Sequence, residues 1–332
     1  MGTKNLVLEH LENNRGQSLS GAAIAESLGV SRNAVWKAIK ELRSEGYEIS
    51  AATNRGYSLE ETSDILSKAS IAAFLQEDAS KVDVQVFDCL PSTSRTAKEL
   101  AISGVTHGTL ILADTQSEGT GRKQGRSFAS PSGGIYMSLV LRPEQVHFSN
   151  ITHVTACAAV CVCEALETVC AVSPKIKWVN DVFIGDKKVC GILTEAVTDF
   201  ESGGLGWLVL GIGINFSARS DEFPESLRDI VCSVYPDGKP KMPRSQVIAE
   251  IVRRVLAMCE KGDDSEIFKK YKSRMMLLGE KVNVIQGDDV YSATALDINE
   301  DGHLIVKTES GEIQTLFSGE VSIRKTPIVN QL

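Results

Sequence analysis

The chain has 332 residues, of which 42% are hydrophobic and 23% are charged, a composition typical of globular proteins. This length predicts two or three domains rather than one small core. The formal net charge of −8 excludes a protein that coats nucleic acid through bulk positive charge. Residues 1–60 differ from the rest, because their seven Lys and Arg balance their seven Asp and Glu, so the acidic excess lies in residues 61–332.

No segment predicts export or a membrane partner. Glu9 and Glu12 interrupt the apolar run that a secretory signal needs, and Leu6 stands where a myristoylation signal requires Ser or Thr. Residues 151–170 are strongly apolar, but their two Glu and three Thr predict a buried helix. Four of the eight cysteines fall there, and we expect them to be reduced core residues rather than metal ligands in a cytoplasmic protein.

Residues 1–63 are predicted to form a winged helix-turn-helix domain. Ser20 and Ser31 are placed to cap two consecutive helices, and Gly29 ends the first of them. An alternating pattern after the last helix predicts a hairpin, the wing. The expected helices cover residues 6–11, 21–28 and 32–44, and the expected strands cover residues 47–52 and 56–59.

The third of these helices has two different faces. Val35, Ala38, Ile39 and Leu42 recur at helical spacing and predict a buried face. The opposite face is polar and cationic, as in a recognition helix that contacts bases near its N-terminus and phosphates further along. The candidate DNA-binding residues are Ser31, Arg32, Asn33, Trp36, Lys37, Lys40, Arg43 and, in the wing, Arg55. The alternative is a helical cap whose cations are only solvated.

Residues 64–278 are predicted to form an α/β domain with a mixed sheet, because strands and helices alternate from residue 82 onward. Residues 60–67 indicate a linker. Strands are expected at residues 82–88, 109–113, 135–141, 175–178, 189–197 and 205–214, and helices at residues 93–102, 151–170, 246–259 and 266–276.

Residues 279–332 contain five short predicted strands, at residues 282–285, 290–298, 304–308, 313–317 and 321–323. Turns rich in Gly and Asp separate them, which predicts a small SH3-like β-barrel. A passive cap on the preceding domain and a direct functional role agree equally well with this pattern.

The strongest chemical signal is Gly-Thr-Gly-Arg-Lys-Gln-Gly-Arg at residues 119–126. Its glycines allow the backbone to wrap closely around a ligand, and Arg122, Lys123 and Arg126 add positive charge. The spacing matches neither a P-loop nor the G-x-G-x-x-G fingerprint. The segment therefore predicts binding of a phosphate or carboxylate and leaves the ligand open.

A second polar cluster, Lys-Trp-Val-Asn-Asp, occupies residues 177–181 at a predicted strand end. Lys188 begins another strand seven residues after Asp181. Each feature alone has an ordinary explanation, since Trp178 suits a core, Asn180 and Asp181 suit a turn, and a lysine at a hairpin is usually solvated.

Together these segments resemble the biotin–protein ligase family. Residues 177–181 resemble its Lys-Trp-Pro-Asn-Asp signature, with Lys188 and a Gly-Ile-Leu segment following at the expected spacing. Residues 92–94 resemble its Ser-Thr-Asn, Gln116 precedes the glycine-rich segment, and residues 211–215 and 319–324 match two further motifs. Because the resemblance covers all three predicted domains in order, it is to the bifunctional type that also represses the biotin operon.

The resemblance implies the chemistry. The carboxylate of biotin attacks the α-phosphate of MgATP to give biotinyl-5′-AMP, and a lysine of the biotin carboxyl carrier protein of acetyl-CoA carboxylase then accepts the biotinyl group. Such chemistry depends on positioning and charge neutralisation more than on an enzyme nucleophile. The resemblance also implies a ligase domain related to class II aminoacyl-tRNA synthetases, and a homodimer that binds operator DNA when the adenylate is bound.

The resemblance also assigns residues. The catalytic candidates are Arg122, Lys177, Asp181 and Lys188. The biotin-binding candidates are Ser92, Thr93, Ser94, Gln116, Gly119, Thr120, Gly121, Arg122, Lys188 and Gly191. The candidates for ATP and adenylate are Arg122, Arg126, Asn180, Gly213, Asn215 and Arg324. No side-chain cluster predicts a metal site, and Mg²⁺ is expected to enter with ATP, near Asp181.

The sequence departs from the family pattern at several positions. Val179 replaces the signature proline, Ser94 replaces asparagine, Thr120 replaces a common arginine, and residues 122–124 include one additional residue. Two alternatives stay open: a ligand-sensing transcription factor without ligase activity, and a lipoate–protein ligase.

Overall fold

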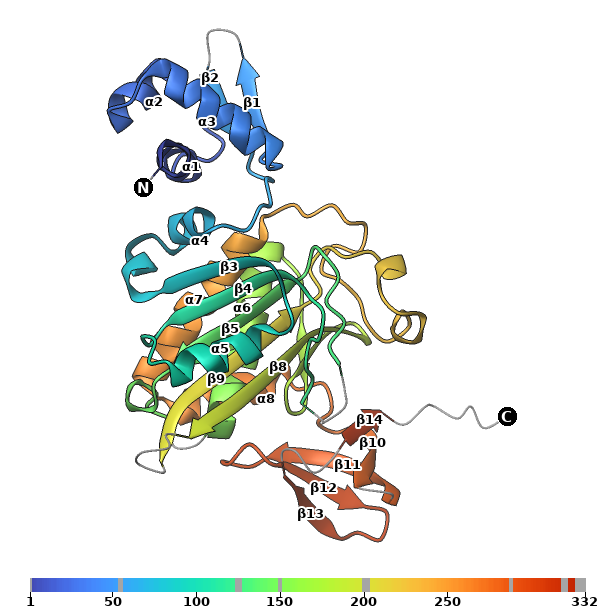
Figure 1. The fold of residues 1–332 in the computed structure, drawn as a ribbon. Coiled ribbons are helices and arrows are strands. Elements are labelled where there is room, and N and C mark those ends of the chain that lie inside the picture. Colours follow the sequence, from blue (N-terminus) through green and yellow to red (C-terminus); the bar gives the residue numbers. More distant parts are fainter. Residues whose placement is uncertain are drawn as a thin grey trace.

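The structure is a computed structural model, and it describes residues 2–52, 56–122, 127–148, 151–198, 204–286, 289–317 and 322–325. Helices with a two-stranded hairpin come first, a seven-stranded sheet follows, and a five-stranded sheet comes last. Figure 1 shows these three parts in succession from the N-terminus to the C-terminus.

The N-terminal part has the predicted helix-turn-helix arrangement. Ser20 and Ser31 cap α2 and α3, because each hydroxyl accepts a hydrogen bond from the backbone N–H three residues later. Gly29 ends α2 in the left-handed conformation, with φ of 64°. The elements are α1 (Thr3–Glu12), α2 (Gly21–Leu28), α3 (Arg32–Ser44), and the antiparallel strands β1 (Ile49–Ala52) and β2 (Gly56–Leu59).

A helix that the sequence analysis did not predict, α4 (Lys68–Leu75), follows the predicted linker. Ser67 and Ser70 begin it with a capping box, in which each hydroxyl accepts a hydrogen bond from the other residue's backbone N–H. α4 packs against α1 of the N-terminal part and α7 of the central part. It has eight residues, too few to show a clear helical period in the sequence.

Arg244 joins the linker to the central sheet. Its side chain is 6% exposed, and its guanidinium forms ion pairs with Asp64 at 2.8 Å and Asp114 at 2.7 Å. The same guanidinium donates to the carbonyl oxygen of Gly134 at 2.9 Å. A buried cation is tolerated when charge partners and hydrogen bonds replace water in this way.

The central sheet has the order β3-β4-β5-β9-β8-β7-β6. β3 and β4 are parallel and the other described pairs are antiparallel, so the predicted mixed sheet is confirmed. β7 was not predicted, because it is only four residues long and begins in a polar segment. The strands are β3 (Asp83–Leu90), β4 (Thr109–Gln116), β5 (Ile135–Leu141), β6 (Lys175–Lys177), β7 (Asp181–Ile184), β8 (Lys187–Thr198) and β9 (Leu205–Ile214).

Helices cover both faces of this sheet (Figure 1). α5 (Thr93–Ile102) lies on one face, and α6 (Ile151–Cys170), α7 (Arg244–Lys261) and α8 (Asp264–Arg274) lie on the other. Short 3-10 helices occupy Gln76–Lys81, Pro143–Gln145, Ser220–Glu222 and Glu225–Leu227.

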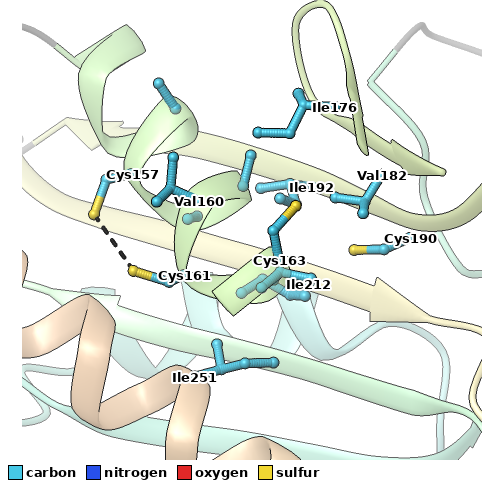
Figure 2. Packing of buried hydrophobic residues seen from close by; sticks show 14 of the residues in the cluster. Cys157, Val160, Cys161, Cys163, Ile176, Val182, Cys190, Ile192, Ile212 and Ile251 are labelled. Carbon is cyan, nitrogen blue, oxygen red and sulfur yellow. Dashed lines mark hydrogen bonds between the residues drawn. The ribbon is translucent and has the colours of Figure 1, made fainter. Parts of the chain in front are cut away.

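α6 is the buried helix that the sequence predicts. Thr152–Cys170 is long and apolar enough to cross a membrane, but 67% of its most apolar window is buried inside the protein. Figure 2 shows that Cys157, Cys161 and Cys163 pack into the core. Burial raises the pKa of Cys163 to about 12, so its thiol stays protonated and unreactive.

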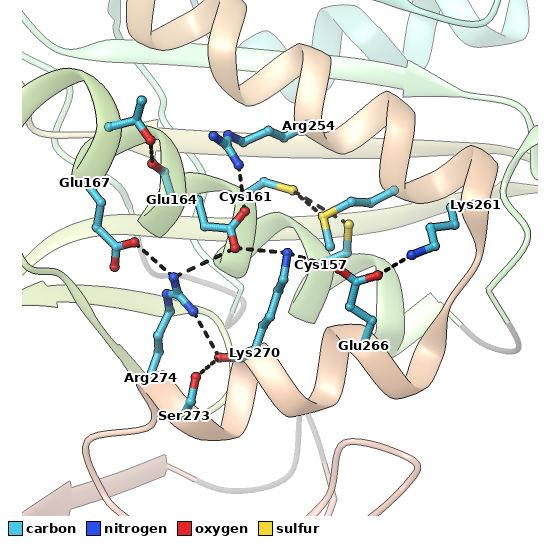
Figure 3. Close-up of polar contacts among 12 residues, drawn as sticks. Cys157, Cys161, Glu164, Glu167, Arg254, Lys261, Glu266, Lys270, Ser273 and Arg274 are labelled. Carbon is cyan, nitrogen blue, oxygen red and sulfur yellow. Dashed lines mark hydrogen bonds and ion pairs between the residues drawn. The ribbon is translucent and has the colours of Figure 1, made fainter.

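Charged side chains link α6, α7 and α8 to one another (Figure 3). Glu164 on α6 pairs with Arg254 on α7 at 2.8 Å and with Lys270 on α8 at 3.1 Å. Arg274 pairs with Glu167 at 2.9 Å. These ion pairs join the three helices that cover this face of the sheet.

The C-terminal sheet is antiparallel, with the order β13-β12-β11-β10-β14. Its buried residues, among them Val282 and Leu304, belong to the same hydrophobic cluster as the central part. The indole Nε1 of Trp178 donates to the carbonyl oxygen of Gly302 at 2.9 Å. The strands are β10 (Lys281–Gln286), β11 (Asp289–Ile298), β12 (Leu304–Thr308), β13 (Ile313–Leu316) and β14 (Ser322–Lys325).

We expect Arg244→Met to lower the free energy of unfolding by about 3–5 kcal/mol, because it leaves buried carboxylates without their cation. Arg219→Met is the matched control, since Arg219 pairs with Asp221 at 3.1 Å on the surface and should contribute about 1 kcal/mol or less. Urea unfolding of both variants measures the difference. Equal losses would contradict the role given to Arg244.

Candidate functional site

A pocket lies where the N-terminus of α5 faces strands β4, β8 and β9 and the segment after β4. Its lining combines hydroxyl, amide, cationic and glycine residues with several large apolar ones. The lining residues are Ser92, Thr93, Ser94, Gln116, Thr120, Gly121, Arg122, Phe128, Met137, Asn180, Lys188, Gly191, Ile192, Leu193, Gly211, Ile212 and Gly213.

Glycines form the floor of this pocket. Gly191 on β8 pairs with Gly213 on β9, and Gly211 lies one side-chain position away on the same face. A Cβ on Gly213 would lie 2.7–3.1 Å from three atoms of the Phe128 ring, and one on Gly211 would lie 2.5 Å from Ser94 Oγ. Side chains at these positions would therefore fill the space between the sheet and the residues that face it, Ser94 and Phe128.

Hydrogen bonds fix the polar end of the pocket. Gln116, the last residue of β4, accepts from the backbone N–H of Thr93 at 2.8 Å and from its hydroxyl at 3.2 Å. The Gln116 amide nitrogen donates to Ser130 at 2.9 Å. Ser138 on β5 lies beneath these residues, 2.9 Å from the Thr93 hydroxyl and 3.1 Å from that of Ser94.

The glycine-rich segment follows the end of β4 and folds back, so that the residues on its two sides pair with each other. The backbone N–H of Phe128 donates to the carbonyl oxygen of Gly119 at 2.8 Å, and Thr120 and Ser127 form a β-bridge. A Cβ on Gly119 would lie 2.4 Å from the carbonyl oxygen of Phe128, so this closure requires glycine. Residues 123–126, which include Arg126, lie outside the described residues.

Two cations reach the other end of the pocket. Lys188 pairs with Asp181 at 2.7 Å, and each side chain is nearly a third exposed. The backbone of Lys188 is held by Ile230 and Cys232, through hydrogen bonds of 2.9 Å each. Burial lowers the pKa of Arg122, and the negative charge of Asp181 opposes that shift. The guanidinium stays protonated, and this end of the pocket is suited to an anion.

The segment between β6 and β7 is anchored from behind. The Asn180 side-chain amide donates to the carbonyl oxygen of Ile192 at 2.7 Å, and the N–H of Ile192 donates back to the Asn180 carbonyl at 3.0 Å. The buried hydroxyl of Tyr271 donates to the carbonyl oxygen of Val179 at 2.7 Å. Trp178 is a core residue, 6% exposed, which agrees with the interpretation from the sequence that it suits a core.

The pocket brings together most of the predicted ligand-binding residues. Some of the predicted residues do not line it. Asp181 contacts Lys188, and Lys177 Nζ lies 5.5 Å from the Phe183 ring. Gly119 lies where the two sides of the glycine-rich segment meet. Asn215 is 3% exposed, and its Oδ1 has no partner among the described residues. Arg126, Arg55 and the side chain of Arg324 lie outside the described residues.

Sequence reasoning missed Phe128 and Ser138. Ser138 interrupts the otherwise apolar strand at residues 135–141, and a polar residue in a fully buried strand is a signal that could have identified it. Phe128 gave no such signal, since its ring is recognisable as a pocket wall only when β8 and β9 lie beneath it.

The candidate DNA-binding residues of α3 divide into two groups. Arg32, Asn33, Trp36, Lys37 and Lys40 are exposed on one face, with Lys40 Nζ 5.6 Å from the Trp36 ring. Arg43 donates to the carbonyl oxygen of Ile49 at 2.8 and 2.6 Å and so holds the hairpin. The Ser31 hydroxyl caps α3.

Comparison with known proteins agrees with this arrangement. Residues 3–58 match the HTH domain model, residues 86–215 match the Biotin/lipoate A/B protein ligase family, and residues 277–324 match the Biotin protein ligase C terminal domain. The chain is 33% identical to the bifunctional ligase/repressor BirA of Bacillus spizizenii over 92% of this chain and 94% of that protein. It is 29% identical to the protein of the same name from Escherichia coli K12, over 93% and 94%.

A solved structure shares the fold of about three quarters of the chain. The biotin protein ligase from Aquifex aeolicus in complex with biotin and ATP is 30% identical, with a TM-score of 0.63, over 74% of this chain and 99% of that one. The fold and the pocket thus define a biotin protein ligase with an N-terminal helix-turn-helix domain. The chain belongs to the family of the bifunctional ligase/repressor BirA.

We expect Gly211→Ala to weaken biotin binding by about tenfold, because overpacking against Ser94 costs on the order of 1–3 kcal/mol. Isothermal titration of the full chain with biotin measures the effect. Gly21→Ala, in α2 and away from the pocket, is the control and should bind as the unchanged protein does. Unchanged affinity in Gly211→Ala would refute the role given to the glycine floor.

Proposed function

We propose that the protein activates biotin with ATP to biotinyl-5′-AMP and transfers the biotinyl group to a lysine of the biotin carboxyl carrier protein of acetyl-CoA carboxylase. The observation that carries this proposal is one pocket that is lined both by hydroxyl and amide groups and by two cations, Arg122 and Lys188. Such a pocket suits a ligand with a neutral polar head and an anionic tail.

The ring of biotin is assigned to the polar end. Ser92, Thr93, Ser94 and Gln116 supply hydrogen-bonding groups there, and Gly191 leaves room for the ligand on the sheet. The backbone of Gly119, Thr120 and Gly121 follows the valeryl chain toward the cations. Two contacts support this direction: a Cβ on Gly211 would lie 2.5 Å from Ser94 Oγ, and a Cβ on Gly191 would lie 3.3 Å from Lys188 Nζ.

The reacting groups are assigned to the cationic end. Arg122, Lys188 and Arg126 hold the biotin carboxylate and the α-phosphate, so that two anionic groups approach each other against a neutralising field. Asn180, Gly213, Asn215 and Arg324 are assigned to the nucleotide. The buried Oδ1 of Asn215, which has no partner in the part of the chain that the structure describes, supports this, since it can accept from an amino group.

Asp181 and Lys177 complete the proposed catalytic set. Asp181 is held by Lys188 at 2.7 Å and is partly exposed, and this supports a role for its carboxylate toward an incoming lysine. The same carboxylate fits a Mg²⁺ ion that enters with ATP, because Mg²⁺ usually takes one or two carboxylates together with phosphate oxygens. Bound there, Mg²⁺ would neutralise phosphate charge.

The second proposed activity is repression. We infer that the adenylate-bound protein forms a homodimer, and that the two α3 helices, with Arg55 in the wings, then bind a palindromic operator of biotin genes. The exposed face with Arg32, Asn33, Trp36 and Lys37 supports base contacts near the helix N-terminus.

We also propose the finer organisation of the chain. Residues 1–63 form a winged helix-turn-helix domain, residues 64–278 form a ligase domain of the class II aminoacyl-tRNA synthetase type, and residues 279–332 form a domain that closes as an SH3-like barrel. Closure of this barrel requires its edge strands, β13 and β14, to meet. As a separate proposal, we infer that the protein acts in the cytoplasm.

We expect Lys188→Ala to lower kcat/KM for biotinylation roughly a hundredfold, as loss of one charge-stabilising donor does. Streptavidin blotting of a carrier domain incubated with biotin and ATP measures this. Lys98→Ala is the matched control, because Lys98 pairs with Glu195 at 2.9 Å outside the pocket. No labelled band from the unchanged protein would favour a ligand-sensing transcription factor, and lipoyl mass on the acceptor lysine would favour a lipoate ligase.

We expect Lys40→Ala to weaken binding to promoter DNA of the biotin genes and to reduce the slope of log K against log salt by about 0.9 for each lost phosphate contact. If Lys40 contacts a base instead, binding weakens while that slope stays the same. Lys68→Ala, a surface lysine paired with Asp83, is the control. Gel shifts with and without biotin and ATP measure the affinity for DNA in each state. An affinity that is the same in both states would overturn the repressor proposal.

A further inference from the structure

Ser138 is a fully buried polar residue within a chain of hydrogen bonds beneath the pocket. It lies on β5, is 0% exposed, and faces Thr93 and Ser94 at the start of α5. The chain runs from Ser94 through Ser138, Thr93 and Gln116 to Ser130. None of the functional roles above uses Ser138.

One backbone group decides the direction of every bond in this chain. The N–H of Thr93 can only donate, so the atom of Gln116 that faces it at 2.8 Å must be the amide oxygen. The Thr93 hydroxyl faces the same oxygen at 3.2 Å and must also donate to it. A hydroxyl has one hydrogen, so Thr93 has none left for Ser138.

The direction continues to Ser94. Ser138 must donate its hydrogen to the Thr93 oxygen at 2.9 Å. Its own oxygen, 3.1 Å from Ser94 Oγ, can then only accept, so Ser94 donates to Ser138. The hydrogen of Ser94 is directed away from the ligand, and Ser94 presents only lone pairs to the pocket that it lines.

The other end of the chain has the opposite polarity. Once its oxygen faces Thr93, the Gln116 amide presents its NH₂ group toward Ser130, and one N–H is used there at 2.9 Å. The Ser130 hydroxyl donates onward to the Phe128 carbonyl oxygen at 3.0 Å. The second N–H of Gln116 has no acceptor among the described residues and belongs to a pocket-lining group.

We propose that Ser138 is a positioning residue for biotin. Ser138 accepts the hydrogen bond that the Ser94 hydroxyl can donate. Ser94 can therefore only accept from a ligand N–H, while the Gln116 amide can still donate to a ligand carbonyl oxygen. This pairing is complementary to a cyclic urea, which carries N–H groups and a carbonyl oxygen side by side. The inference rests on the proposed function for the identity of the ligand, and it adds the residue that sets the polarity of the site.

Gly211 makes the arrangement possible. It pairs with Ser138 across β5 and β9, and its missing Cβ leaves the space that Ser94 Oγ occupies, 2.5 Å from the position a Cβ would take. Ser94 is the residue that departs from the family's asparagine. A shorter side chain can reach Ser138 directly from the first turn of α5.

The test is isothermal titration of the full chain with biotin, together with KM and kcat for biotin and for ATP. Ser138→Ala should bind biotin about tenfold more weakly, as loss of an orienting hydrogen bond in a desolvated site predicts. The KM for ATP and kcat should change less than twofold. Ser138→Thr keeps the hydroxyl and should restore affinity, and Ser138→Cys, with a weak S–H donor, should not.

A matched control separates positioning from stability. Ser70 is also 0% exposed and bonded to another serine, but it lies in α4, so Ser70→Ala should leave biotin binding unchanged. Ser94→Ala, a milder change that keeps the protein testable if Ser138→Ala fails to fold, should also weaken binding about tenfold. Because Ser138 acts through Ser94, the double variant should be no weaker than Ser94→Ala alone.

The outcomes distinguish the two proposals. If the unchanged protein does not bind biotin, the proposed function fails. If it binds biotin and Ser138→Ala binds as well as Ser70→Ala does, the proposed function stands and the role of Ser138 is overturned. Independent, additive effects of Ser138→Ala and Ser94→Ala would likewise overturn the coupling between them.

Discussion

The absence of Cβ atoms at Gly191, Gly211 and Gly213 is the constraint on which the site depends. These glycines let α5 and the segment around Phe128 approach β8 and β9 closely while a pocket remains between them. A Cβ on Gly211 or Gly213 would lie 2.5 Å from Ser94 Oγ or 2.7 Å from the Phe128 ring, shorter than real atoms adopt, and one on Gly191 would lie 3.2 Å from the same ring. β8, β9, α5 and the segment around Phe128 can therefore line one pocket only because the two strands carry no side chains at these glycines.

The strand that ends in this pocket also connects to the helix-turn-helix part. Gln116, which accepts from Thr93, and Asp114, which pairs with Arg244, both belong to β4. Arg244 in turn holds Asp64 in the segment that follows the hairpin. A buried guanidinium with charged partners has one favourable geometry, so the DNA-binding part is attached to the ligase part through an ordered contact.

Much of the fold could be predicted because its signals are local. Ser20, Gly29 and Ser31 set the ends of α2 and α3 within a few residues of chain. α4 and β7 could not be predicted, since a helix of eight residues and a strand of four show little periodicity and are stabilised by partners elsewhere in the chain. Figure 1 shows α4 seated between two parts that only the folded chain brings together.

The sequence by itself determined the order of the domains, the glycine-rich cationic segment and the family, because spacing along the chain preserves such motifs. Only the tertiary structure decided that Ser138 belongs to the site, since its partners Thr93 and Ser94 lie 45 and 44 residues away. The direction of a hydroxyl is not a property of serine. It follows from which neighbour can only donate, and that neighbour is supplied by folding.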